Sequence, residues 1–137
     1  MNHPAKKRVF LSFIAEDKDH ADGVRLLSAS PRYKHLEFYD ESVRIPIQSS
    51  DAAYVKQRIR EKISRTSVTV CLVSEKTHAS PWVDWELEES FKKGNTVIAM
   101  AIKGTNRAIL PRPIRERQLP FFPWDPELLG RLISEAP

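Results

Sequence analysis

A short acidic segment with two tryptophans, "SPWVDWELEES" at residues 80–90, holds the side chains best suited to chemistry. Ser80 can cap a helix and Pro81 suits the first helical position, so a helix is predicted to begin here. On a helical wheel, Glu86 falls within the apolar arc that also holds Leu87. A carboxylate in an apolar arc must be paired, protonated or turned toward a cleft.

Two interpretations of Glu86 follow from its position. In the first, it forms an ion pair with a nearby cation, such as Arg8 or Lys103. In the second, it faces a ligand, and the indole of Trp82, one helical turn earlier, forms a wall beside it. The N-terminal end of this helix is expected near the carboxyl edge of a sheet, where open α/β folds bind ligands. This placement supports the second interpretation, and both stay open at this point.

The elements that must position Glu86 alternate along the chain. Short apolar runs predict four strands, at residues 8–13, 36–40, 67–73 and 96–102. Helical periodicity lies between them, at residues 15–27, 51–63 and 81–93. This alternation predicts an α/β fold, with a parallel sheet of four to five strands and helices on both faces.

Beyond residue 103 the chain changes character, because five of its ten prolines fall between Pro111 and Pro126. We expect a mostly irregular segment with one short edge strand, followed by a last helix capped by Asp125. No internal repeat or low-complexity tract divides the sequence. We therefore expect one domain over residues 1–137, with its motifs in residues 8–103 and a proline-rich segment with the last helix at 104–137.

Composition excludes several classes of function. The chain has 137 residues, of which 41% are hydrophobic and 29% charged, as in soluble globular domains. It has neither an apolar run long enough to span a membrane nor a recognisable signal peptide, so we expect a cytoplasmic protein. The single cysteine, Cys71, lies in a predicted buried strand and can form no internal disulfide. The four histidines show no metal-ligand spacing, and no metal site is predicted.

The net charge of +4 raises the question of whether the chain binds nucleic acid. Basic residues are spread thinly, and the densest basic segment, "RAILPRPIRERQ" at 107–118, carries no interleaved aromatic residues. We interpret it as a solvated loop and do not expect nucleic-acid binding. The sequence also has neither the Walker pattern nor GxGxxG, so a nucleotide would have to bind at the carboxyl ends of the strands.

Three segments together resemble TIR domains. "RVFLSFIAEDK" is similar to the opening motif of that family, "LEFYDESVRIPIQSS" stands where the family has its second strand and BB loop, and "SPWVDWELEES" resembles its S-x-W-V-x-x-E-L segment. The combination is most similar to the TIR-like domains of bacterial anti-phage Thoeris systems, of the ThsB type. The resemblance covers residues 8–103 and implies a flavodoxin-like three-layer fold.

The resemblance also implies an activity and a site. Glu86 would be the catalytic residue of an enzyme that cleaves the nicotinamide–ribose bond of NAD+, with NAD+ as substrate and no other cofactor. The substrate-binding residues would come from three segments: Ser12, Phe13 and Ile14 after the first strand, Asp40 and Ser42 after the second, and Trp82 on the helix. The family further implies a homo-oligomer formed through the BB loop, residues 41–50, and helix faces, and a separate effector that senses the nucleotide product.

The residues suit this chemistry. Cleavage builds positive charge on the ribose, which a carboxylate in a dry cleft stabilises, and the leaving nicotinamide needs no general acid. Water as the nucleophile yields ADP-ribose, whereas a nucleophile on the same substrate yields a cyclic isomer. The sequence does not determine which of these two products forms.

Other readings of the chain remain. The main alternative is a TIR-like adaptor that acts only through TIR–TIR contacts. A receiver-like signalling domain is a weaker alternative, because this chain lacks the aspartate that such a domain requires after the third strand. Trp85, on the face opposite Leu87, is expected either at a partner surface or under the C-terminal segment containing Phe121, Phe122 and Trp124.

Overall fold

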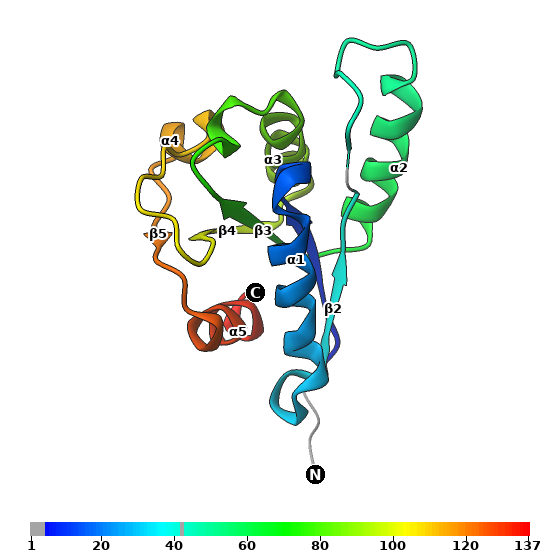
Figure 1. The fold of residues 1–137 in the computed structure, drawn as a ribbon. Coiled ribbons are helices and arrows are strands. Elements are labelled where there is room, and N and C mark those ends of the chain that lie inside the picture. The colour runs from blue at the N-terminus through cyan, green and yellow to red at the C-terminus, as the bar shows by residue number, and fades with distance from the viewer. Residues whose placement is uncertain (1–4, 42) are drawn as a thin grey trace.

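Five parallel strands form the centre of the molecule. The computed structural model describes residues 5–41 and 43–137. In these residues the strands lie in the order β2-β1-β3-β4-β5, and every neighbouring pair is parallel (Figure 1). The strands are β1 (Lys7–Ser12), β2 (Leu36–Tyr39), β3 (Val68–Val73), β4 (Thr96–Ala101) and β5 (Phe121–Phe122). This is the flavodoxin-like order, so the predicted fold class is confirmed.

Helices cover both faces of the sheet. They are α1 (Lys18–Arg25), α2 (Ala52–Ser64), α3 (Pro81–Lys93), α4 (Arg112–Glu116) and α5 (Pro126–Glu135). Short 3-10 turns are η1 (Ala15–Asp17), η2 (Leu26–Ala29), η3 (Pro31–Tyr33) and η4 (Thr77–Ala79). Alternate residues of the strands point to opposite faces. Val9 and Leu11 join a core with α1 and α5, whereas Phe10 and Cys71 face the side covered by α2, α3 and α4.

The predicted strands agree with the structure to within one residue at each end. All six residues of β3 are buried, as a continuously apolar strand in the middle of a sheet requires. Cys71 is among them, and burial raises the pKa of its thiol. The last helix begins as predicted, because the Asp125 side chain accepts a hydrogen bond from the backbone N–H of Leu128.

The interpretation of residues 107–118 as a solvated loop is wrong. The segment contains α4, whose Pro113 and Ile114 are buried. Arg117 lies over the ring of Phe91, 3.8 Å from its centroid, and forms an ion pair with Glu88 of α3 at 3.3 Å. The arginines of this segment thus help to hold it on α3. The apolar positions were too few, and too interrupted by proline, to show helical periodicity in the sequence.

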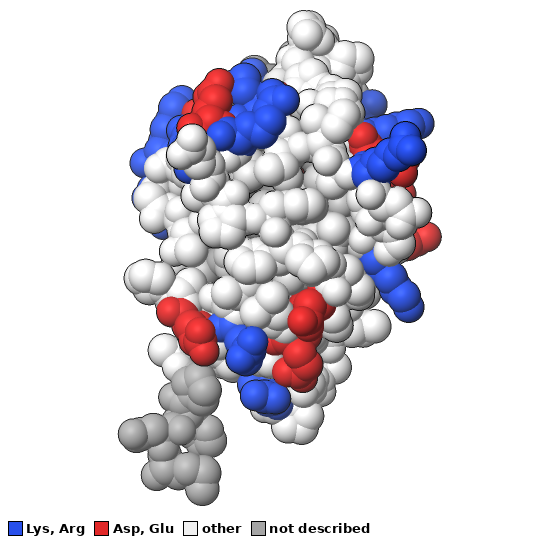
Figure 2. Space-filling view, turned by 90° about the vertical axis from the view of Figure 1, so that its left-hand side faces the viewer, with Lys and Arg blue, Asp and Glu red and all other residues white. Residues whose placement is uncertain are grey.

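Charged side chains do not form one continuous basic surface on the face shown in Figure 2. On this side of the molecule, where α4, β5 and α5 lie in Figure 1, lysine and arginine stand close to aspartate and glutamate near the margins, and the middle carries no charge. Among the residues that the structure describes, no helix combines the length and the apolar character needed to cross a bilayer.

Gly130 lets α5 approach the rest of the core closely. A Cβ atom at this position would lie 2.4 Å from the ring of Tyr33, which is itself buried. Replacing Gly130 with alanine should therefore destabilise the protein by about 1–3 kcal/mol, although alanine is the better helix former. Urea unfolding of Gly130→Ala measures the effect. Equal or greater stability would show that Tyr33 can move aside without cost.

Candidate active site

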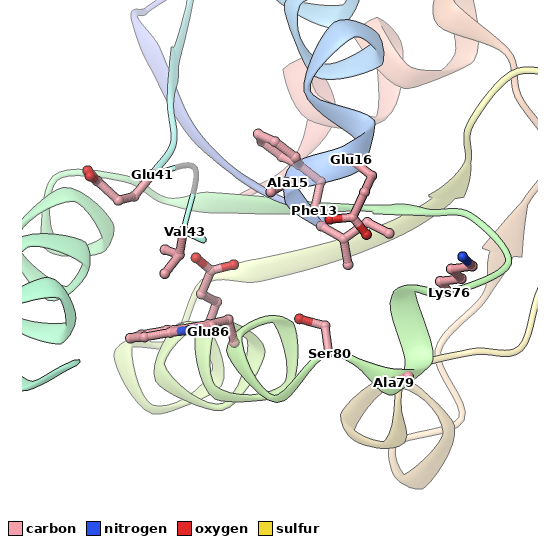
Figure 3. Close-up of a pocket in the computed structure, with 11 residues that line it drawn as sticks. Phe13, Ala15, Glu16, Glu41, Val43, Lys76, Ala79, Ser80 and Glu86 are labelled. Carbon is pink, nitrogen blue, oxygen red and sulfur yellow. The ribbon is translucent and has the colours of Figure 1, made fainter. Parts of the chain in front are cut away.

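A cavity of about 290 Å³ opens at the carboxyl ends of the strands (Figure 3). Three segments form it: the residues that follow β1, those that follow β2, and the connection from β3 into the first turns of α3. The lining residues are Phe13, Ile14, Ala15, Glu16, Glu41, Val43, Lys76, Ala79, Ser80, Trp82 and Glu86.

Helix α3 places the side chains of Trp82 and Glu86 in the cavity lining. The Ser80 hydroxyl accepts a hydrogen bond from the backbone N–H of Val83 at 3.2 Å, and Pro81 occupies the first turn, as predicted. The helix ends at Gly94, whose φ of 91° is the left-handed conformation that favours glycine. Trp82 and Glu86 are four residues apart and therefore lie on the same face of α3.

Glu86 is a buried carboxyl group that receives one hydrogen bond. Its side chain is 3% exposed, and the Ser12 hydroxyl donates to its Oε1 at 2.7 Å. The pKa of Glu86 is raised to about 8, mainly by burial; the Ser12 hydrogen bond lowers it, and the nearby Glu41 raises it. Such a pKa lies in the range where a carboxyl group can change its charge when a ligand binds.

The ion-pair interpretation of Glu86 is wrong. Arg8 pairs instead with Glu37, at 3.0 Å, on the neighbouring strand β2. Within residues 5–41 and 43–137, no lysine or arginine, Lys103 included, forms an ion pair with Glu86. A buried carboxyl group with a strongly raised pKa beside a cavity is a candidate functional group.

Trp82 belongs both to the cavity wall and to the core. Its side chain is 8% exposed and packs in a cluster with Phe10 and Ile59. Its indole Nε1–H donates to the backbone oxygen of Ile45 at 2.7 Å. The ring therefore ties the loop after β2 to the helix that carries Glu86.

Trp85 is covered by α2. The guanidinium of Arg60 lies 5.1 Å from its ring centroid and the ammonium of Lys56 lies 5.5 Å from it. The Trp82 ring packs edge-on against it, at 5.9 Å between centroids. The alternative in which the C-terminal segment covers Trp85 is wrong, because the long side chains of α2 provide this cover, which helical spacing alone does not reveal. The alternative in which Trp85 meets a partner stays a prediction.

Salt bridges anchor the segment after β2. Glu41 binds Lys62 at 2.6 Å and Arg58 at 3.0 Å, both from α2. The Lys62 ammonium also donates to the backbone oxygen of Asp40 at 2.6 Å. The Asp40 carboxylate pairs with Arg25 of α1. The end of β2 is thus held from both sides of the sheet.

A partly buried hydrogen-bond network joins the segment after β1 to the connection between β3 and α3. The Ser74 hydroxyl, just after β3, donates to Oδ2 of Asp17 at 2.6 Å, and the Ser74 backbone N–H donates to Oγ1 of Thr77 at 2.8 Å. Asp17 is 8% exposed and ends the turn that follows β1. The network therefore connects the segment containing Phe13 to the turn that leads into α3.

Comparison with known proteins decides the family. Residues 10–107 match the family described as Thoeris protein ThsB, TIR-like domain. The chain belongs to this family. No curated protein sequence matches the chain.

Solved TIR domains share the fold of this TIR-like domain. The TIR domain of the Toll-related receptor TRR-2 from Hydra magnipapillata is 11% identical, with a TM-score of 0.58 and coverage of 91% of this chain and 90% of that one. The TIR domains of the activated Roq1 resistosome, which directly recognizes the pathogen effector XopQ, are 18% identical with a TM-score of 0.51. That match covers 70% of this chain and 57% of the Roq1 chain, so this chain spans little more than half of the Roq1 chain's length.

The TIR-like domain brings most of the predicted site residues together. Phe13, Ile14, Trp82 and Glu86 line the cavity, and Ser12 lies behind it as the partner of Glu86. The prediction for Ser42 lies outside the described residues.

Asp40 does not line the cavity, because it turns toward α1 and pairs with Arg25. Glu41 and Val43 are the described lining residues of that segment, and Lys76 and Glu16 line the cavity on its other side. Sequence reasoning did not single out these four as site residues. Their positions just after strands were the only available signal.

The Ser12 hydroxyl should control the ionisation of Glu86. Replacing Ser12 with alanine removes the donor that stabilises the carboxylate, so the pKa of Glu86 should rise by about one unit. Carbon-13 NMR titration of the Glu86 carboxyl group measures this change in the wild type and in Ser12→Ala. An unchanged or lower pKa would mean that the hydroxyl donates elsewhere in solution.

The described part of the chain contains no group of three His, Cys, Asp or Glu side chains that could hold a metal ion. The cavity offers one buried carboxyl group, that of Glu86, beside aromatic and aliphatic walls, with the charged side chains of Glu16, Glu41 and Lys76 also in its lining.

Proposed function

We propose that this TIR-like domain cleaves the nicotinamide–ribose bond of NAD+, with Glu86 as its catalytic residue. The observation that carries the proposal is a buried carboxyl group with no cationic partner among the described residues, facing a cavity beside Trp82. A ligand that develops positive charge next to Glu86 would supply the missing counter-charge. The proposed reaction uses neither a metal nor a further cofactor.

The bond between the ribose C1 and the nicotinamide nitrogen breaks, and its electron pair leaves with the ring as neutral nicotinamide. The ribose becomes an oxocarbenium-like cation, which the Glu86 carboxylate stabilises. Water then attacks C1 and releases a proton, giving ADP-ribose, or a nucleophilic atom of the same molecule attacks and gives a cyclic isomer.

The surroundings of Glu86 suit a cationic substrate. A pKa of about 8 keeps much of the Glu86 carboxyl group protonated at neutral pH. The positively charged nicotinamide ring of NAD+ would favour the ionised form on binding. Phe13, Ile14 and Trp82 provide apolar surface that excludes water, which strengthens the attraction between carboxylate and ribose cation.

Incubation of the purified chain with NAD+ tests the proposal. Release of nicotinamide, with ADP-ribose or a cyclic isomer separated by chromatography, is the expected result. A folded chain that releases no nicotinamide, at low or at high protein concentration, would favour the adaptor function, in which the domain acts only through TIR–TIR contacts.

In a Thoeris system, the nucleotide product would act as a signal for a separate effector.

We also propose that activity depends on self-association through residues 41–50 and the adjoining helix α2. The exposed ring of Tyr54, at the start of α2, is 66% accessible and lies beside Arg58. The specific activity should rise with protein concentration in the wild type, and Tyr54→Glu should shift this rise to higher concentration.

Light scattering over a hundredfold dilution, in parallel with nicotinamide release, measures this dependence. Lys34→Ala, at an exposed position away from α2, is the matched control. Constant specific activity from a monomer would contradict the coupling between assembly and activity.

A further inference from the structure

A second cavity continues from the first along the carboxyl ends of the strands. It measures about 300 Å³ and lies between the ends of β1, β3 and β4. Ile14, Glu16 and Lys76 line both cavities, so the two adjoin at these residues. Beyond them the second cavity is bounded by Ile102 and by the loop after β4 that contains Thr105.

We propose that this second cavity binds the adenosine diphosphate half of the dinucleotide, an inference that rests on the proposed function. The substrate would lie across both cavities, with its nicotinamide ribose at Glu86 and its pyrophosphate at the junction. Each cavity alone is at the lower end of the range of about 300–1,000 Å³ that is typical of small-molecule sites. An extended dinucleotide needs the space of both.

Two lysines lie where the pyrophosphate of the proposed substrate would lie, although the carboxylates of Glu16, Asp17 and Glu75 also line the second cavity. Glu86 and Lys76 lie at opposite ends of the first cavity (Figure 3). Lys76 is the single lysine or arginine among the described lining residues of that cavity, and Lys103 joins it in the second. NAD+ has the same order of charges, because its nicotinamide ring is cationic and its pyrophosphate is anionic. Lysine ammonium groups bind phosphate oxygens through charge-assisted hydrogen bonds.

The remaining polar groups of the second cavity suit a ribose and a base. The carboxylate of Asp17 is already engaged by Ser74, whereas Glu16 and Glu75 are exposed and can accept hydrogen bonds from ribose hydroxyls. The apolar surfaces of Ile14 and Ile102 can pack against a planar base.

Two substrates separate this inference from the proposed function. NAD+ carries the adenosine diphosphate half, whereas nicotinamide riboside has the same scissile bond without it. In Lys103→Ala, which changes a residue that lines only the second cavity, the kcat/KM for NAD+ should fall about tenfold, as expected for loss of a charged hydrogen bond. Thr105→Trp, which fills the second cavity, should lower it at least as much. Neither variant should change kcat/KM for nicotinamide riboside by more than about twofold, and Lys34→Ala should leave both values unchanged.

The outcomes are distinct. Equal losses on both substrates, or no loss on NAD+, in variants whose circular dichroism spectra match the wild type would overturn the second-cavity assignment while leaving the cleavage activity in place. Failure of the wild type to release nicotinamide from either substrate would overturn the proposed function, and this inference with it.

Discussion

Glu86→Gln should abolish nicotinamide release and, at the same time, make the protein more stable at alkaline pH. The first effect follows from the loss of the carboxylate that stabilises the ribose cation, and we expect activity to fall at least a thousandfold, about 4 kcal/mol of transition-state stabilisation. The second follows from the cost of ionising a buried carboxyl group. Glutamine fits the same space and can still accept the hydrogen bond from Ser12.

The sign of the stability effect is set by the pKa of Glu86. Its pKa in the folded protein is about 8, compared with an ordinary value of 4.5. Between these values the unfolded chain has lost the proton that the folded chain still holds, so the wild-type free energy of unfolding falls as pH rises from about 4.5 to about 8. This loss is on the order of 5 kcal/mol and is absent in the glutamine variant.

Urea unfolding at pH 5 and at pH 8.5, together with a nicotinamide assay, measures both effects. Glu88→Gln is the matched control on the same helix, because Glu88 is partly exposed and paired with Arg117. It should change stability by less than about 1 kcal/mol and leave activity unchanged. Full activity in folded Glu86→Gln would disprove the catalytic assignment, and equal stability of the two proteins at pH 8.5 would show that the carboxyl group is solvated.

Trp82→Ala should destabilise the protein by about 3–5 kcal/mol, because it leaves a large space in the core beside Phe10 and Ile59. From the sequence, Trp82 was expected only as a pocket wall, so that its loss would impair binding and turnover without unfolding. The structure adds the core packing and the hydrogen bond to Ile45. Since most domains are stable by only about 5–15 kcal/mol, this single change removes a large part of the total.

Trp82→Phe separates packing from the hydrogen bond. Phenylalanine keeps an aromatic wall but cannot donate to the Ile45 oxygen, so the fold should persist with a cost of about 1–3 kcal/mol. Amide hydrogen exchange in residues 43–50 should accelerate, and KM for NAD+ should rise. If exchange in this loop is unchanged, the indole hydrogen bond does not hold the loop in place.

Much of the fold could be predicted because hydrophobic periodicity is a local signal. The apolar run of β3 and the helical spacing of α2 and α3 each lie within one stretch of chain, and their alternation leads to a parallel sheet. The cap at Ser80 and the stop at Gly94 are local for the same reason. The short helix α4 was missed because it comprises only five residues and contains a proline, which leaves no periodicity to detect.

For the candidate site too, some features follow from the sequence and others only from the tertiary structure. The sequence by itself determined that Glu86 lies on an apolar helical face with Trp82 one turn before it, because both belong to one regular helix. Only the tertiary structure decided that Ser12 rather than a cation meets Glu86, that α2 covers Trp85, and that Glu41 rather than Asp40 lines the cavity. These outcomes join residues distant in sequence or depend on which way a side chain turns at the end of a strand, and helical or strand spacing contains no information about either.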